Sequence, residues 1–433
     1  MFLLRLEHKH SPSVSRALWI PTIWMFYAAS KPLGSWFPSS GADPELGSPM
    51  DRAFLIALIG IALILLTRRK FNWRSTIKDN PWLVLLLTFM LLSICWSPVP
   101  FVSFKRWTRE LLAVLMAFCV LSESSPRDAM ESILRRTTYI LIPVSLLLIK
   151  YFPEYGIEYS SDGTRLWIGL AMQKNGLGRL CLIGSFFLIW SLVTRFRENK
   201  PSFWDYQTYT ECFLLFMAFW LLGGPGRSPF YSATSFYTLC LGLLVFSGLS
   251  LAKKRGKMPG SAGIIIVISI IMIYGVAILF TGPSNVAGIA SAANRNDTLT
   301  GRTLIWGVLL PMAMQRPILG HGFGSFWITL KTTSLDILSS HNGYLDVLLG
   351  LGFLGIFLTA AFLLSFGRKA YRILFYDFNW GVLSICFLIM FVVHNITESS
   401  IDSFTLHQSA IIIFLSVTSM AYAFPKNDTS EAL

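Results

Sequence analysis

The chain has 433 residues, of which 54% are hydrophobic and only 14% are charged, and its formal net charge is +13. This composition is too apolar for a soluble domain of that length and predicts an all-α polytopic membrane protein. The basic excess is spread over short loops, as membrane topology requires, so we expect no nucleic-acid partner.

Apolar runs that could cross a bilayer recur along the chain. A helix rises ~1.5 Å per residue, so a hydrocarbon core of ~30 Å takes roughly 20 apolar residues, and about twelve runs meet this criterion. Their approximate centres are Trp24, Ile59, Leu87, Leu115, Leu146, Phe187, Phe216, Leu241, Ile270, Phe357, Ile389 and Phe414. Residues 1–433 are therefore predicted to form a single integral membrane domain. The longest break, 282–340, is expected to be a loop between the ninth and tenth spans.

Lysine and arginine gather in alternate loops, as in Arg68-Arg69-Lys70 and Lys253-Lys254-Arg255. Basic loops are retained in the cytoplasm, so both termini are predicted to be cytoplasmic. On this orientation the 282–340 loop is extracytoplasmic, and the basic residues within it need an explanation.

Arg227 is one basic residue on the outer side, in the glycine-rich turn Gly223-Gly-Pro-Gly-Arg-Ser228 between two spans. An arginine at this boundary could clamp a phosphate group. It could also extend to lipid headgroups, which is the commoner fate of such residues.

Arg302 follows the capping residues Thr298 and Thr300, and apolar residues then recur with helical period up to Arg316-Pro317. This pattern predicts a short interfacial helix with Arg302 in its first turn. A helix N-terminus favours anions, and the guanidinium adds bidentate contacts to phosphate oxygens. An ordinary amphipathic helix with a rim arginine is the alternative.

His341 opens the tenth span, and we expect its imidazole in the first helical turn, where the helix dipole favours a neutral ring. A neutral histidine can act as a base, although a histidine that merely lies at the interface is the commoner case. Asp346 lies about a turn deeper and points away from the His341 face, so we expect it to pair with an outer arginine.

The segment Gly320-His-Gly-Phe-Gly324 has the spacing of part of a nucleotide-binding loop. No strand precedes it, so it is interpreted as a tight turn that returns the chain from the interfacial helix toward His341. Asp297 and Asp336 stand alone in the large loop, and no Asp-x-Asp pair accompanies them. We therefore expect chemistry that needs no metal and no cofactor.

These fragments, in this order, resemble the O-antigen ligase and Wzy-type polymerase superfamily. They are Gly-Arg227-Ser, Leu-Thr-Gly-Arg302-Thr-Leu-Ile-Trp306, Pro317-Ile-Leu-Gly-His-Gly-Phe-Gly324 and His341-Asn-Gly-Tyr-Leu345. The segment Gln173-Lys-Asn-Gly-Leu-Gly178 is most similar to bacterial exopolysaccharide polymerases of the succinoglycan type. His321 departs from the pattern, since an aromatic or small residue is expected between those glycines.

The resemblance implies a GT-C-like inverting, metal-independent glycosyltransferase of the bacterial inner membrane, with its active site facing the periplasm. Its substrates would be an undecaprenyl pyrophosphate-linked oligosaccharide and an acceptor glycan, met among membrane lipid, with a flippase and a chain-length regulator as partners. Essential residues of the family match Arg227 and Arg302 as pyrophosphate ligands and His341 as catalytic base. Lys174 and Asn175 match a recurrent substrate-binding pair.

Three functions stay open from the sequence. The first is polymerisation of lipid-linked repeats into exopolysaccharide. The second is an O-antigen ligase that transfers lipid-linked glycan to lipid A-core or protein. The third is a transporter or flippase of lipid-linked sugars, which would instead be expected to carry repeats, broken helices or charges at the middle of the bilayer.

Overall fold

The structure is a computed structural model that describes residues 14–37, 48–159, 163–198, 205–223, 232–258, 260–280, 302–331, 337 and 339–422. Helices dominate these residues, with one two-stranded sheet. In chain order the elements are η1 (Arg16–Leu18), α2 (Trp19–Ala29), α3 (Leu33–Trp36), α4 (Pro49–Arg68), α5 (Trp73–Asp79), α6 (Pro81–Leu92), η2 (Ser93–Trp96), α7 (Pro100–Leu121), α8 (Pro126–Tyr151), α9 (Pro153–Gly156), β1 (Ile157–Tyr159), β2 (Arg165–Trp167), α10 (Lys174–Glu198), α11 (Tyr206–Gly223), α12 (Ala233–Lys254), α13 (Ser261–Ala277), α15 (Arg302–Ala313), α16 (Phe326–Lys331), α17 (Gly343–Tyr376), α18 (Phe378–His394), α19 (His407–Thr418) and η3 (Ser419–Tyr422).

Each predicted apolar centre lies within a helix, which confirms the all-α membrane class. Within the described ranges, five helices are long and apolar enough to cross a membrane, namely α4, α8, α10, α12 and α17. A sixth span results if α5 and the helical segment Pro81–Trp96, which meet at 93°, are counted as one broken span. The other helices at predicted centres are shorter or more polar, so the count of about twelve spans stays a prediction.

Local sequence signals set where several helices begin. Helices α4, α6, α7 and α8 each start on a proline, whose fixed φ suits the first helical turn and whose missing N–H costs no hydrogen bond there. Ser48 and Ser125 precede two of these prolines and accept hydrogen bonds from Met50 N at 3.1 Å and Asp128 N at 3.4 Å. Serine followed by proline therefore marks these helix starts in the sequence.

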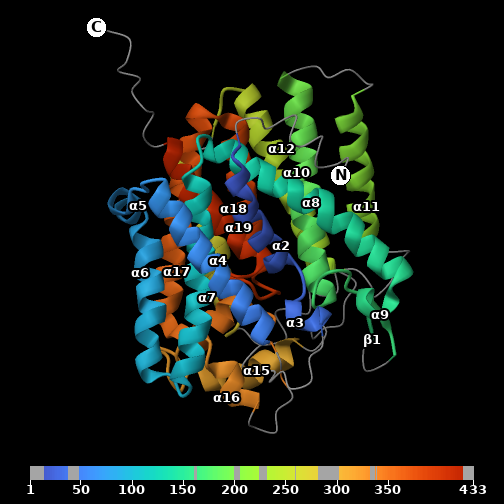
Figure 1. Ribbon diagram of the computed structural model, residues 1–433. Coiled ribbons are helices and arrows are strands. Elements are labelled where there is room, and N and C mark those ends of the chain that lie inside the picture. Colours follow the sequence, from blue (N-terminus) through green and yellow to red (C-terminus); the bar gives the residue numbers. More distant parts are fainter. Residues whose placement is uncertain are drawn as a thin grey trace.

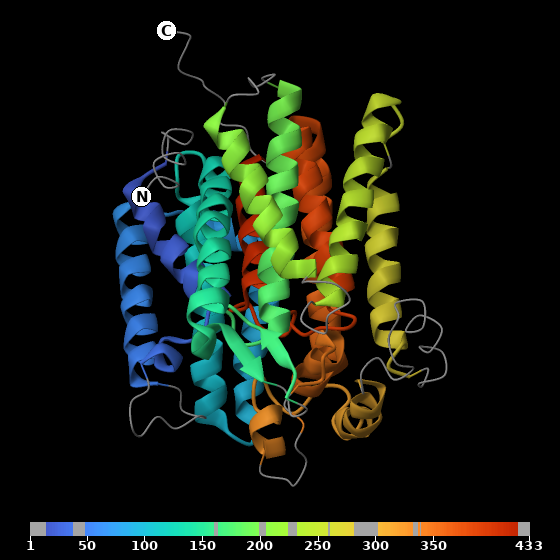
Figure 2. The same ribbon diagram turned by 90° about the vertical axis from the view of Figure 1, so that its right-hand side faces the viewer.

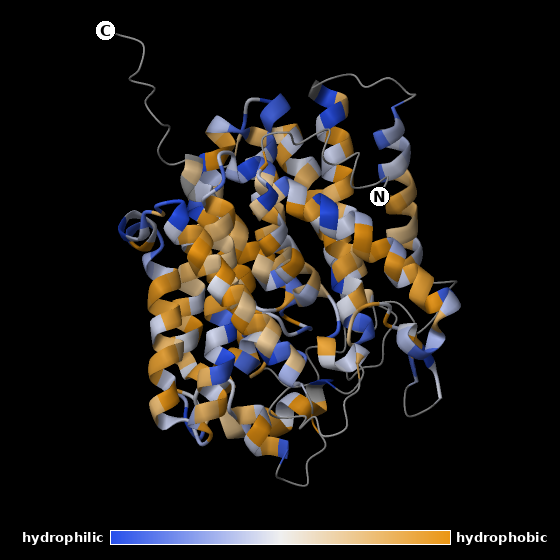
Figure 3. Cartoon of the chain, viewed as in Figure 1, coloured by the Kyte–Doolittle hydropathy of each residue, from blue (hydrophilic) through white to orange (hydrophobic). Residues whose placement is uncertain are grey.

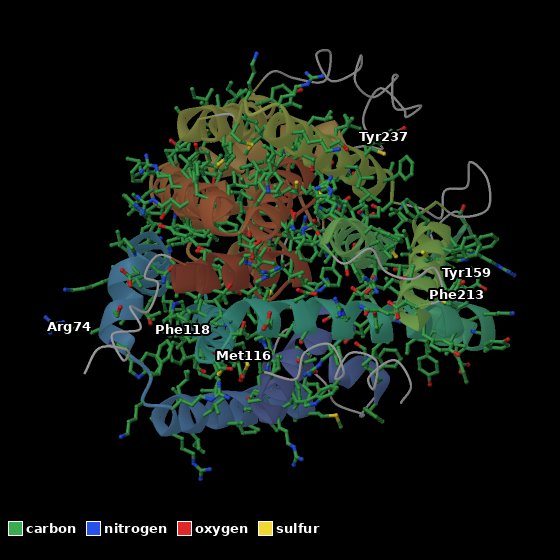
Figure 4. All side chains as sticks on the ribbon, turned by 90° about the horizontal axis from the view of Figure 1, so that it is seen from above. Arg74, Met116, Phe118, Tyr159, Phe213 and Tyr237 are labelled. Carbon is green, nitrogen blue, oxygen red and sulfur yellow. The ribbon has the colours of Figure 1, made fainter. Side chains whose placement is uncertain are left out.

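Helices α18 and α19 lie at the centre of the bundle, and α18 packs against α12 and α17. Nearly every residue of these two helices is buried, so they form the core of the bundle. Apolar residues dominate the middle of the helices in Figure 3, with hydrophilic residues gathered toward the ends. In the view along the bundle, Phe213 and Tyr237 lie at the periphery (Figure 4), and they are 59% and 50% exposed.

The short helices α15 and α16 lie together at one end of the bundle, and the β1–β2 hairpin lies toward the same end (Figures 1 and 2). The two strands pair antiparallel, with Ile157 opposite Trp167. We call this end of the molecule the site end. The segment 395–406, which joins α18 to α19, is directed toward it, and so is the start of α17 (Figure 2).

A glycine-rich loop docks against a break in α17. Gly320, Gly322 and Gly324 have φ of 67°, 96° and 66°, which confirms the predicted tight turn. Helix α17 is broken at Gly352, with φ 65°, and this frees backbone groups there. The loop uses them, since His321 N donates to Leu349 O at 2.9 Å and Gly322 N donates to Gly350 O at 2.9 Å.

His321, which departs from the family pattern, has a packing role. Its Nε2 lies 3.0 Å from Met312 O at the end of α15, and its ring lies 5.3 Å from that of Phe326, measured between centroids. The imidazole therefore ties α15 to α16 through the glycine loop.

Gly320→Ala is expected to destabilise the protein by about 1–3 kcal/mol, because its backbone is left-handed and a Cβ there would lie 2.5 Å from Gly350 C. The matched control is Gly307→Ala within α15, where a Cβ meets nothing within 4 Å. This substitution should stabilise the folded protein by about 0.5–1 kcal/mol, because alanine favours a helix over glycine. Thermal unfolding of the purified protein in detergent measures both. Equal midpoints for the two variants would contradict the docking of the loop.

Candidate functional site

The segment between α18 and α19 is shaped by polar side chains. Asn395 Oδ1 accepts hydrogen bonds from Ser400 N and Ile401 N, each at 2.9 Å, and so closes the turn. Gly343 N, at the start of α17, donates to Asn395 O at 2.9 Å. Buried backbone groups need such partners, and these fix the segment against α17.

Glu110 of α7 holds the other half of the same segment. Its carboxylate accepts from Ser403 Oγ at 3.1 Å and from Phe404 N at 2.5 Å. The segment is thus anchored on both sides, and the residues between the anchors have defined positions.

Glu398 lies between these anchors and joins the residues that sequence analysis selected. Its Oε1 lies 2.7 Å from Arg302 Nη2 and 2.7 Å from Asn175 Nδ2. Its Oε2 lies 4.0 Å from His341 Nδ1, an electrostatic contact that is longer than a hydrogen bond. One buried carboxylate therefore brings together Arg302, Asn175 and His341.

Arg302 begins α15, so the predicted short helix with Arg302 in its first turn is confirmed over Arg302–Ala313. The guanidinium also donates through Nη1 to Thr397 O. Trp306, one turn later, donates from Nε1 to Ser340 O at 2.9 Å and fastens α15 to the residue before His341. A guanidinium has five N–H donors, so donors remain for a ligand.

His341 does not lie in the first turn of α17, and that prediction is wrong. Asn342 is the N-cap, its Oδ1 accepting from Leu345 N at 3.0 Å, and the helix starts at Gly343. His341 precedes the cap with φ 52°, a left-handed conformation that is uncommon for a residue with a side chain. This backbone turns the imidazole, which is 31% exposed, toward Glu398 rather than along the helix.

Glu398 is ionised in this environment. Burial alone would raise its pKa, but the contact with His341 and the charge of Arg302 outweigh that effect and lower the pKa from 4.5 to about 2. A permanently charged carboxylate facing Nδ1 favours a proton on that nitrogen, so that Nε2 is left as the acceptor of the ring. This is the tautomer that a general base needs.

The remaining predicted residues have different outcomes. Lys174 opens α10 beside Asn175 and is half-buried, so it lies next to the cluster. Arg227 lies outside the described residues. Asp346 accepts a hydrogen bond from Ser399 Oγ, not from an arginine, among the described contacts. Its expected pairing with an outer arginine is thus replaced by a contact to the 395–406 segment.

Glu398 was missed by sequence analysis, although a signal was present. An acidic residue directly after an apolar run is expensive to bury and is a functional-site candidate by default. Arg179 of α10 was also missed as a site residue, and its Nη1 donates to Ser399 O at 2.8 Å. Their sequence distance from His341 concealed both of them, because only the packing of α10 and α18 beside α17 brings them there.

The fold and the site together define an integral membrane protein whose charged cluster lies at one end of a helical bundle. Residues 212–360, which contain Arg302 and His341, match the family described as O-antigen ligase. This match supports the resemblance to the O-antigen ligase and Wzy-type superfamily that the motifs predicted, and with it a glycosyltransferase-type enzyme of the polymerase or ligase kind.

A curated relative extends the similarity over most of the chain. The exopolysaccharide production protein ExoQ of Rhizobium meliloti (strain 1021) is 23% identical over 371 residues, which cover 81% of this chain and 80% of the relative. Together with the family match, this similarity supports a membrane polysaccharide-related ligase or polymerase.

The lowered pKa of Glu398 predicts how stability depends on pH. Its ionised form contributes roughly 3 kcal/mol that is fully present above about pH 4.5 and is lost as the pH falls toward 2. The unfolding midpoint of the wild-type protein should therefore fall more steeply between pH 6 and 3 than that of Glu398→Gln. Glu154→Gln, at an exposed acid of α9, is the control and should follow the wild type. If the unfolding midpoints of the wild type and of Glu398→Gln fell in parallel with pH, Glu398 would not be ionised and paired in the folded protein.

Proposed function

We propose that this enzyme polymerises undecaprenyl pyrophosphate-linked oligosaccharide repeats into exopolysaccharide. The observation that carries the proposal is the contact of one buried carboxylate, Glu398, with both Arg302 and His341. The exopolysaccharide relative supports the polymerase branch of the family.

In the proposed reaction, His341 Nε2 takes the proton from an acceptor hydroxyl. The hydroxyl oxygen attacks the anomeric carbon of the donor sugar from the face opposite the pyrophosphate, and the bond between that carbon and the phosphate oxygen breaks. The configuration at the anomeric carbon is inverted. Glu398 holds the imidazole in the required tautomer and stabilises the imidazolium that forms.

The leaving group departs as undecaprenyl pyrophosphate, whose charge must be stabilised. Arg302 supplies a planar guanidinium at a helix N-terminus, a combination suited to phosphate oxygens. We assign Arg227 as the second pyrophosphate ligand, and Lys174 and Asn175 as substrate contacts. Asn175 already donates to the same carboxylate oxygen as Arg302.

The proposal includes a topology. We place about twelve spans in a single GT-C-like membrane domain of residues 1–433, with the 282–340 loop and the site end facing the periplasm. Both termini are cytoplasmic in the bacterial inner membrane, as the basic loops indicate. A flippase would deliver the donor to the site end, and a chain-length regulator would act on the product.

The ligase is the second candidate, because the matching family is described as O-antigen ligase. The two functions share a donor site and differ in the acceptor. Lipid-linked glycans from a deletion strain distinguish them, since single repeats accumulate when polymerisation is lost and long lipid-linked chains accumulate when ligation is lost.

Substitutions of the cluster should abolish chain lengthening by purified enzyme in detergent supplied with lipid-linked repeat. We expect His341→Ala to lower kcat by about 10²–10⁴-fold, the contribution of a general base, and Arg302→Ala to lower it by about 10²–10³-fold, as for the loss of an oxyanion donor. Arg316→Ala is the control, since this exposed arginine lies just beyond α15. Normal elongation by His341→Ala would remove the base assignment.

Chelation tests the proposed use of guanidinium groups in place of a metal. Elongation should proceed at an unchanged rate after dialysis against EDTA, because Arg302 and Arg227 carry the leaving-group charge. Loss of activity that magnesium or manganese restores would contradict this part of the mechanism.

A further inference from the structure

A cavity lies at the site end, next to the cluster around Glu398. It has a volume of about 250 Å³ and lies between α7, α16, the first turns of α17 and the 395–406 segment. Its wall includes Arg109, Trp327, Asp346, Asp402 and Thr405, whereas Arg302, His341 and Glu398 do not line it. The proposed reaction therefore leaves this cavity without a role.

Asp346 points to a ligand in this cavity. The residue is only 7% exposed, and its Oδ2 accepts a hydrogen bond from Ser399 Oγ. Besides Ser399, the Ser340 side chain is the other hydrogen-bonding group that acts on this carboxyl among the described residues. The Oδ1 atom is buried and forms no hydrogen bond of good geometry. A carboxyl oxygen can accept hydrogen bonds, and a buried one that accepts none is costly, so the group calls for a ligand that presents an O–H or N–H.

The other walls of the cavity indicate what that ligand is. Trp327 is half-buried and adds an aromatic ring to the wall, while Ser403 and Thr405 supply hydroxyls and Arg106 and Arg109 supply N–H donors. Apolar rings with a few placed polar groups are typical of small-ligand sites. The C–H face of a sugar suits the ring, and its hydroxyls suit the carboxylate.

The volume of the cavity limits the size of its ligand. It is below the ~300–1,000 Å³ of typical pockets for drug-sized ligands, which suits a sugar ring better than a lipid chain.

The cavity is connected to the cluster around Glu398 through adjacent residues. Ser399, which donates to Asp346, directly follows Glu398, which contacts Arg302 and His341. A glycan bound at Asp346 would therefore lie near Ser399, the residue next to the carboxylate that contacts His341. We infer that this cavity binds a sugar of the acceptor glycan, an assignment that rests on the proposed glycosyl transfer.

Binding without turnover tests the inference separately from the reaction. The probe is the phosphate-free repeat oligosaccharide, released from the lipid-linked pool of the host by mild acid and titrated calorimetrically into the full-length protein in detergent. Asp346→Asn and Trp327→Ala should each weaken binding by at least about 10-fold, as expected for loss of a buried hydrogen bond or a ring contact. Arg302→Ala and His341→Ala should bind the oligosaccharide within about 2-fold of the wild type.

Inorganic pyrophosphate gives the reciprocal measurement. Arg302→Ala should weaken its binding, whereas Asp346→Asn should leave it unchanged, and pyrophosphate should not displace the oligosaccharide. Arg109→Gln provides a further cavity variant if Asp346→Asn unfolds. Only variants whose unfolding midpoint equals that of the wild type are compared. Absence of oligosaccharide binding by the wild type, or wild-type affinity in the cavity variants, overturns the inference.

The two proposals can fail separately. If the wild type elongates chains and Asp346→Asn binds the oligosaccharide as tightly as the wild type does, only the assignment of the cavity is wrong. If the binding pattern is as expected but the wild type does not elongate chains, the sugar site stands and the proposed polymerase function is wrong.

Discussion

The buried carboxylate of Glu398 is the interaction on which the site depends. An ionised carboxylate is costly to take out of water unless it is paired and hydrogen-bonded, and here α15, α10 and the residue before the α17 cap each supply a partner. Removing one partner leaves a charge that the bundle cannot solvate. The same contact that satisfies the carboxylate also aligns the imidazole, so the stability of the site and the catalysis that we propose depend on the same residues.

The break in α17 positions the glycine-rich loop 320–324, which follows α15 in the chain. A continuous helix would have no free carbonyls at Leu349 and Gly350, and the glycine loop would have nothing to dock on. With the break at Gly352, the loop closes against α17, and His321 connects it to the end of α15. The orientation of Arg302 is thus set partly by glycines far from it in sequence.

Sequence patterns predicted the features that depend on local chemistry. Apolar runs located the helices, the glycines of 320–324 gave the turn, and the helix that starts at Arg302 was identified by its period. Glu398 could not be identified in this way, because its role arises from contacts with residues more than 50 positions away. The start of α17 was misplaced by two residues, since Asn342 provides the cap and the helix begins at Gly343 rather than at His341.

The charge balance around Glu398 explains how one site can hold a fixed carboxylate and still suit the anionic donor that we propose. Arg302 and Arg179 both act electrostatically on this carboxylate or the residue beside it, so two guanidinium groups face one permanent negative charge. Burial raises the pKa of Asp402, which favours its neutral form and removes a competing charge. The surplus positive charge is available to a diphosphate, and guanidinium groups bind phosphate oxygens well when they are held rigidly. Glu398 therefore fixes the arginines in place without neutralising them.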